Sequence, residues 1–308
     1  MILVAGEALV DLVPVPGAPQ APPVARPGGG PYNTAVALGR LGEPTAFCSR
    51  ISTDAHGREL IAGLRAAGVD TTPVLRGPEP TPLAVSTLGP DGSARYEFRV
   101  EGTADRLFTA PARLPEGTRA VSFGTCSLVL EPGASAYEEL MRRAAGAGLL
   151  TVVDPNVRPA LVPDAEEHRA RFRSWLPHTG LLKLSEEDAE RLGGDPGAWL
   201  AAGAGAVVLT RGERGMSAFP GPGRRIDVPA VRVPVVDTIG AGDTVTAALL
   251  HGLARHDALY PTGPAGLGDA VWTELLTFAA RAAALTCSRP GAQPPTAAEV
   301  AEAALAGR

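Results

Sequence analysis

Several residue types that mark particular classes of protein are scarce in this chain of 308 residues. The three cysteines lie far apart, at positions 48, 126 and 287, so they predict neither a disulfide framework nor a zinc site. The five histidines have no metal-ligand spacing either. A formal net charge of −5 argues against nucleic acid or an acidic membrane surface as a partner.

Long apolar runs and a basic leader are also missing. Apolar runs break off well short of a membrane span, and the N-terminal MILVAGEALVDLVP continues into a strand-like pattern. The sequence lacks a P-loop motif, a nucleophile elbow and an HExxH motif, which argues against the enzymes built on them. We expect a soluble, cytoplasmic protein with no membrane partner.

Lysine is almost absent. Lys183 is the only lysine among the 28 lysine and arginine residues. An ammonium group is a compact point charge, which arginine replaces badly beside a phosphate. Lys183 is therefore a candidate for such a position, although its chance survival under a compositional bias explains it equally well.

What the chain does contain is an alternation of apolar, β-branched segments with helical ones. Strands are predicted at 2–4, 45–51, 120–123, 149–154, 180–184 and 206–210. Helices are predicted at 34–41, 57–67, 134–147, 186–192, 198–202, 270–285 and 297–305. This order predicts one α/β domain over residues 1–308, with a doubly wound, mostly parallel sheet covered by helices on both faces. Ligands of such sheets bind beyond the carboxyl ends of the strands.

Two segments depart from the alternation. Residues 9–27 combine short strand signals with several prolines, and residues 82–100 alternate around a Pro-Asp-Gly turn as a β-hairpin does. We expect the segments at about 9–27 and 82–104 to form a small β-sheet beside the main one. Such a sheet serves either as a lid or as a dimer surface.

The octapeptide DTIGAGDT, residues 237–244, is the most informative stretch. It lies between a valine-rich segment at 231–236, predicted as a strand, and a helical segment. Glycines at 240 and 242 allow backbone N–H groups to converge on an anion at the helix N-terminus. Asp243 then supplies a base, as phosphoryl transfer requires. On these residues alone, a tight turn with Asp243 as the N-cap is an equally good interpretation.

Polar residues in the N-terminal part offer contacts for a hydroxylated ligand. In GGGPYNTAVALGRLG (28–42), Gly28 and Gly29 permit a close approach to the backbone. Asn33 either binds a hydroxyl or caps the helix that begins around it. Asp11, framed by apolar neighbours, either faces solvent, as strand alternation favours, or binds ligand hydroxyls.

Two further loops follow predicted strands. In DPNVRP (154–159), Asp154 is a candidate for holding Mg²⁺ through water and Arg158 for clamping phosphate. An Asp–Arg pair that only stabilises the turn is the alternative. The TRGERG loop (210–215) is weak evidence by itself, because many turns look like it.

Taken together, the 28–42 and 237–244 segments resemble the two signatures of the ribokinase-like (PfkB) sugar kinase family, in the family's order. GEALVDLVP, DPNVRPAL and KLSEED resemble the bacterial fructokinases of that family, so the resemblance spans almost the whole chain. It implies that Asp243 is the catalytic base and that Gly240, Ala241 and Gly242 form an anion hole.

The resemblance also implies binding roles for other residues. The implied sugar-binding set, with Asp243, is Asp11, Gly28, Gly29, Asn33, Arg99 and Arg158. The implied ATP-binding set, with Gly240 and Gly242, is Lys183, Ser185, Thr210, Gly212, Gly215 and Ala279. Asp154 and Asp188 would meet Mg²⁺, mainly through water. Asp237, Ser288 and Gly291 would surround a K⁺ ion.

The implied reaction is transfer of the γ-phosphoryl group of ATP to a primary hydroxyl of a small sugar, first of all fructose. Arg99 stands where fructokinase-like sequences often have an aromatic residue. A cation there favours a sugar acid, so 2-keto-3-deoxygluconate kinase is the alternative function. A catalytically idle sugar-binding protein on the same fold is another. A homodimer through the small sheet is a further expectation.

Overall fold

The computed structural model describes residues 1–14, 22–88 and 94–306. Its main sheet has eight strands in the order β14-β13-β12-β11-β10-β9-β1-β4. All neighbours from β4 to β12 are parallel, and β13 and β14 are antiparallel additions at one edge. The strands are β1 Ile2–Ala5, β4 Thr45–Cys48, β9 Ala120–Gly124, β10 Leu150–Asp154, β11 Leu181–Ser185, β12 Val207–Thr210, β13 Met216–Phe219 and β14 Ile226–Val228. The predicted doubly wound sheet is confirmed.

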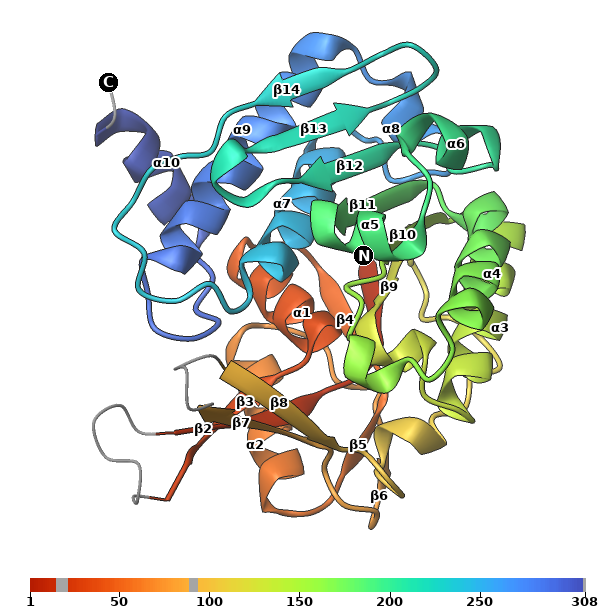
Figure 1. The fold of residues 1–308 in the computed structure, drawn as a ribbon, viewed down its shortest axis with the longest axis vertical. Coiled ribbons are helices and arrows are strands. Elements are labelled where there is room, and N and C mark those ends of the chain that lie inside the picture. Colours follow the sequence, from red (N-terminus) through yellow and green to blue (C-terminus); the bar gives the residue numbers. More distant parts are fainter. Residues whose placement is uncertain (15–21, 89–93, 307–308) are drawn as a thin grey trace.

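Helices cover both faces of this sheet (Figure 1). One face packs against α1 Gly30–Arg40, α2 Ala55–Ala66, α7 Ala241–Arg255, α9 Asp269–Cys287 and α10 Ala297–Ala306. The other packs against α3 Gly133–Gly146, α4 Ala165–Trp175, α5 Glu186–Leu192 and α6 Pro196–Ala201. Strand alternation divides the core: Ile2 and Val4 point to the first face, Leu3 and Ala5 to the second.

Short elements complete the domain. They are the single-turn helix α8 Gly263–Gly266 and the 3₁₀ turns η1 Asp105–Leu107, η2 Thr125–Leu128, η3 Pro159–Leu161, η4 Leu176–His178 and η5 Gly212–Arg214. Strands β5 Arg50–Ser52 and β6 Leu75–Gly77 form a parallel pair. Side chains cap the N-termini of several helices: Asp54 caps α2, Asp164 caps α4 and Asp195 caps α6.

A second sheet lies beside the main one, at the lower left of Figure 1. Its order is β3-β2-β7-β8, from β2 Leu9–Val13, β3 Val24–Gly28, β7 Leu83–Leu88 and β8 Ala94–Arg99. The two predicted segments therefore pair with each other, β2 running parallel to β7. The β7–β8 hairpin is confirmed, while its Pro-Asp-Gly turn and residues 15–21 lie outside the described residues.

Three local predictions differ from the structure, and strand β13 was not predicted. Residues 231–236 form no strand: no strand of the described residues pairs with them, and Val235 and Val236 are 65% and 61% exposed. The predicted strand 45–51 divides into β4 and β5. The first helix begins at Gly30 rather than around Asn33. The TRGERG loop joins β12 to an antiparallel β13 that the sequence pattern did not reveal.

Within the described part of the chain, no helix is both long and apolar enough to cross a membrane.

Candidate active site

Asp243 lies in the first turn of α7. The helix is preceded by Gly240 in the left-handed conformation (φ 77°), and no side chain of the described residues caps its N-terminus. Asp243 therefore does not act as the N-cap, and that alternative interpretation is wrong. Its carboxylate instead accepts a 2.8 Å hydrogen bond from the side-chain amide of Asn33. The two residues are brought together by the packing of α1 against α7.

The Asp243 carboxylate is buried, and this burial raises its pKa to about 6. The Asn33 hydrogen bond opposes the rise, the nearby charge of Asp154 adds to it, and Lys183 and Arg158 lower the pKa again. The group is thus mostly ionised at neutral pH, with a proton affinity well matched to a general base.

The backbone before Asp243 presents N–H groups to the same place. Among the described residues, no acceptor is found for the N–H groups of Gly240, Gly242 and Asp243, whereas that of Ala241 donates to the Thr238 carbonyl (3.2 Å). A Cβ on Gly240 would lie 2.7 Å from the Ala292 Cβ, so only glycine fits there. The helix N-terminus adds its partial positive charge, so this geometry suits an anion.

The glycine turn before α1 faces this helix. Gly29 has a φ of 103°, and a Cβ there would lie 2.9 Å from the Glu7 carbonyl oxygen. Asn33 lies in the first turns of α1, whose N-cap is Gly29, so the capping interpretation of Asn33 is wrong. Gly28 leaves room for the Asp11 carboxylate, which would collide with any Cβ there.

Asp11 is half-buried and faces the pocket rather than solvent, against the interpretation that strand alternation favoured. Burial raises its pKa to about 6, which the positive charge of Arg158 opposes. Its carboxylate has no hydrogen-bond partner among the described residues. It is therefore free to accept bonds from ligand hydroxyls.

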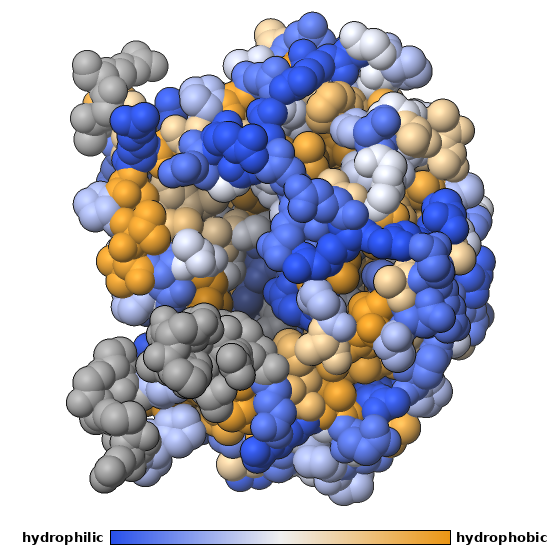
Figure 2. All heavy atoms as spheres, viewed as in Figure 1, coloured by the Kyte–Doolittle hydropathy of each residue, from blue (hydrophilic) through white to orange (hydrophobic). Residues whose placement is uncertain are grey.

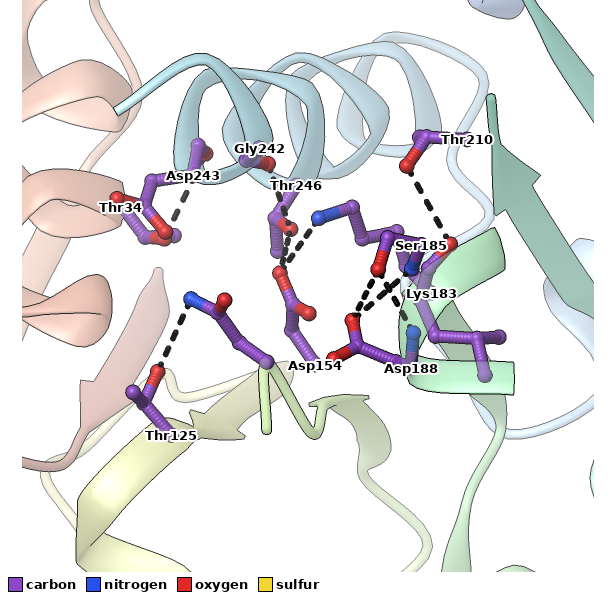
Figure 3. Close-up of polar contacts among 12 residues, drawn as sticks. Thr34, Thr125, Asp154, Lys183, Ser185, Asp188, Thr210, Gly242, Asp243 and Thr246 are labelled. Atoms are coloured by element: carbon purple, nitrogen blue, oxygen red, sulfur yellow. Dashed lines mark hydrogen bonds and ion pairs between the residues drawn. The ribbon is translucent and has the colours of Figure 1, made fainter. Parts of the chain in front are cut away.

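A buried ion pair lies behind the first turn of α7 (Figure 3). Lys183 Nζ is 2.7 Å from Asp154 Oδ2, which also accepts a bond from the Thr246 hydroxyl (3.1 Å). The ammonium group would lie 3.0 Å from a Cβ on Gly242, so it adds a point charge close to the anion site. Asp154 thus pairs with Lys183 and not with Arg158, which donates to the Asn156 side chain (2.6 Å).

The proposed metal ligands have few free oxygens. Asp188 accepts from the Val157 N–H through Oδ1 and from the N–H and hydroxyl of Ser185 through Oδ2, closing a capping box at α5. Asp154 Oδ1 is buried and has no hydrogen-bond partner in the part of the chain that the structure describes. Among the described residues, no group of three or more His, Cys, Asp or Glu side chains is placed to hold a metal ion. This donor set suits contact with Mg²⁺ through water better than a protein cage.

These elements surround a pocket of about 420 Å³ beyond the carboxyl ends of β1, β9 and β10. Figure 2 shows the hollow on this face of the molecule. The pocket unites the predicted Asp11, Gly29, Asn33, Arg158, Gly240, Gly242 and Asp243. It also includes Asn156, the amide of the DPNVRP loop, and residues that the sequence did not single out, namely Glu7, Gly30, Phe98, Thr125, Cys126, Glu187 and Arg191. Position after a strand was the available signal for Thr125 and Asn156, both of which have a positive φ.

Arg99 does not line this pocket. It is exposed, pairs with Glu97 (3.0 Å) and borders a separate groove on the small sheet. The aromatic residue that lines the pocket is its neighbour Phe98, which register places opposite the pocket residue Ala84. Successive strand residues point to opposite faces, and the sequence alone did not show which of the two faces inward.

We predict different effects for these neighbours. Phe98→Ala should raise the KM for the acceptor substrate about tenfold, because an aromatic face on the pocket is lost. Arg99→Ala should change that KM by less than about twofold, since an exposed ion pair contributes little. Steady-state kinetics of both variants check this; a larger effect at Arg99 would contradict it.

The remaining predicted residues lie away from the pocket. Ser185 and Thr210 lie opposite each other at the carboxyl ends of the paired strands β11 and β12. Gly212 and Gly215 lie in the hairpin that follows β12. Ala279 is fully buried in α9, so the structure does not bring its side chain to an open surface. Asp237 and Gly291 do meet: the Gly291 N–H donates to Asp237 Oδ2 (2.8 Å). Ser288 follows α9 and donates to the Leu285 carbonyl.

A buried carboxylate at a helix N-terminus, neighbouring backbone N–H groups that are unpaired among the described residues, and a polar pocket under a small sheet are the arrangement expected of a kinase of small hydroxylated molecules. The family model described as pfkB family carbohydrate kinase matches residues 1–299, and the chain belongs to this family. The predicted resemblance is thereby confirmed.

The individual relatives to which this chain is similar include fructokinases. The chain is 40% identical over 281 residues to the fructokinase of Rhizobium leguminosarum bv. trifolii, covering 87% of this chain and 84% of the relative. The fructokinase of Xylella fastidiosa with bound ATP is 28% identical, with a TM-score of 0.89 over 99% of this chain and 98% of that one. A double mutant of the Vibrio cholerae O395 fructokinase, with fructose, ADP and potassium ion bound, is 25% identical, with a TM-score of 0.83 over 98% and 97% of the two chains.

Proposed function

We propose that this protein transfers the γ-phosphoryl group of ATP to a primary hydroxyl of fructose. The observation that carries the proposal is the buried Asp243 carboxylate, placed between an anion site and a pocket with free hydroxyl acceptors. The curated fructokinase at 40% identity supports fructose as the acceptor. Arg99, on which the sugar-acid alternative depends, lies outside the pocket.

The site's own residues divide the work. Asp11 and Asn33 hold sugar hydroxyls, and Asp243 takes the proton of the attacking hydroxyl as its bond to phosphorus forms. The N–H groups of Gly240, Gly242 and Asp243, with Lys183 behind them, stabilise negative charge on the moving phosphoryl group. Because the transition state is loose, this positioned charge contributes more than the base does.

The same proposal covers the other implied groups. Thr210, Gly212 and Gly215 border the nucleotide. Mg²⁺ bound with ATP would neutralise charge on the phosphates, and Asp154 and Asp188 would contact its water shell. Asp237, Ser288 and Gly291 would hold a K⁺ ion. The small sheet closes over the sugar as a lid and excludes water. Self-association through that sheet stays a prediction, which the mass measured in solution tests.

Coupled ADP release tests the function. The purified protein is assayed with ATP, Mg²⁺ and fructose, glucose, ribose or 2-keto-3-deoxygluconate, and without sugar. We expect kcat/KM for fructose to be at least about tenfold higher than kcat/KM for the other sugars. A sugar whose hydroxyls do not match the site leaves polar groups of the site unpaired, which is costly. Faster turnover of the sugar acid would favour the alternative kinase, and no turnover with any sugar would favour a binding protein. Replacing K⁺ by choline in the same assay tests the ion.

A further inference from the structure

Glu7 is the most deeply buried acidic side chain among the described residues, and it belongs to the pocket wall. It follows β1 and has no exposed surface. Its Oε2 accepts hydrogen bonds from the N–H (3.0 Å) and the hydroxyl (2.7 Å) of Ser127. Its Oε1 has no partner among the described residues. The mechanism above gives this carboxyl group no role.

The hydrogen bonds around Ser127 fit a neutral Glu7. The Ser127 oxygen is 2.7 Å from Glu7 Oε2 and 2.5 Å from the Gly124 carbonyl oxygen, but a hydroxyl has one proton to donate. If Glu7 is ionised, the single proton of the Ser127 hydroxyl can serve only one of the two acceptors, and the other acceptor receives no hydrogen bond from it. If Glu7 is protonated at Oε2, its O–H donates to Ser127 and the Ser127 proton serves Gly124.

The surroundings of Glu7 also favour its neutral form. Burial raises the pKa of Glu7 to about 7, and the Ser127 hydrogen bonds oppose that rise. The ionisable groups that face Glu7 are Asp105 from η1, Cys126 from η2 and Tyr137 from α3. Burial raises the pKa of each of these as well, and none brings a positive charge. Arg158, on the same pocket, forms no described ion pair with Glu7.

The turn that Ser127 anchors carries part of the sugar pocket. Thr125 begins η2 with a φ of 59°, lines the pocket and lies within 3.4 Å of the Asn156 amide nitrogen. A backbone in this region persists when its surroundings hold it. Gly6 allows this turn to pack closely against the end of β1, because a Cβ there would lie only 2.7 Å from the Ser127 hydroxyl oxygen.

We propose that Glu7 is a positioning residue for the sugar: as a neutral acid it locks the Gly124–Leu128 turn to the end of β1 and so holds Thr125 in place. Ionisation of Glu7 leaves a charge without a counter-ion and loosens the turn. This inference deepens the proposed function and rests on it for the identity of the sugar.

Fructose kinetics across pH test the inference. In the wild type, we expect the KM for fructose to rise about tenfold from about pH 6.5 to about pH 8.5, while kcat changes less than about twofold. A tenfold change in KM corresponds to sugar binding and Glu7 ionisation being coupled by about one pKa unit. Glu7→Gln reproduces the neutral acid, so its KM should stay at the low-pH value throughout. Glu7→Ala and Ser127→Ala should raise KM about tenfold at every pH.

A matched control neutralises another carboxylate, that of the half-buried Glu138. Glu138 belongs to α3 and bonds to Trp175 and Arg171 of α4, away from the pocket, and Glu138→Gln should retain the wild-type pH dependence. The proposal would be overturned if the rise in KM with pH persisted in Glu7→Gln. It would also be overturned if the KM of Glu7→Gln were as high as that of Glu7→Ala.

Thermal unfolding without sugar separates this proposal from the proposed function. The pKa of Glu7 is higher in the folded state than its ordinary value of 4.5, so its contribution to stability is full at low pH and is lost as the pH rises through 7. The Tm of the wild type minus that of Glu7→Gln should therefore fall from about pH 5 to about pH 8. A difference independent of pH would refute the role of Glu7, even if fructose proves not to be the substrate.

Discussion

Asp243→Asn lowers kcat about 10³-fold, while the binding of sugar and nucleotide stays within a few-fold of wild type. The range of 10²–10⁴-fold is typical for the loss of a general base. The asparagine keeps the shape of the carboxylate and a hydrogen-bonding oxygen for Asn33, so the pocket should survive. Steady-state kinetics with fructose and ATP measure the loss of kcat. Equilibrium binding of each substrate measures whether its affinity is retained.

The pH dependence of the wild type supports the same assignment. Burial raises the pKa of Asp243 to about 6, and the base must be ionised to act, so kcat should fall as the pH drops below about 6. Asp269→Asn is the matched control, because Asp269 also lies in the first turn of a helix but is exposed, and its loss should leave kcat unchanged. A wild-type kcat in Asp243→Asn would refute the mechanism.

Lys183→Met destabilises the fold by about 3–5 kcal/mol. The side chains of Lys183 and Asp154 are only 5% and 10% exposed, and their ion pair is 2.7 Å long. Removing one partner leaves the other as an unpaired buried charge, whose cost exceeds the net contribution of the pair. Urea unfolding followed by circular dichroism measures the change in the free energy of unfolding, with the slope compared between variants.

A double-mutant cycle identifies the cause. If the unpaired Asp154 is responsible, the double variant Lys183→Met with Asp154→Asn should recover a large part of the lost stability. Arg99→Met removes an exposed ion pair of similar length and should cost less than about 1 kcal/mol. A double variant less stable than Lys183→Met would show that the lysine acts in another way.

The sequence predicted the parts of the molecule that neighbouring residues encode. The period of apolar residues predicted the sheet and most helices, and the glycines at 28, 29, 240 and 242 predicted tight turns. Each of these depends on interactions within a few residues. The valine-rich segment at 231–236 shows the limit of such patterns, since a strand also needs a partner, and the described structure supplies none.

Tertiary packing decided how distant residues meet. Asn33 bonds to Asp243 because α1 packs against α7, so neither side chain caps its own helix. Asp154 has Lys183 as its partner because β10 and β11 are neighbours. The sequence by itself thus determined the fold class, the two glycine turns and the candidate base. Only the tertiary structure decided that Phe98 and not Arg99 faces the pocket, because strand register is set by pairing between segments and not within them.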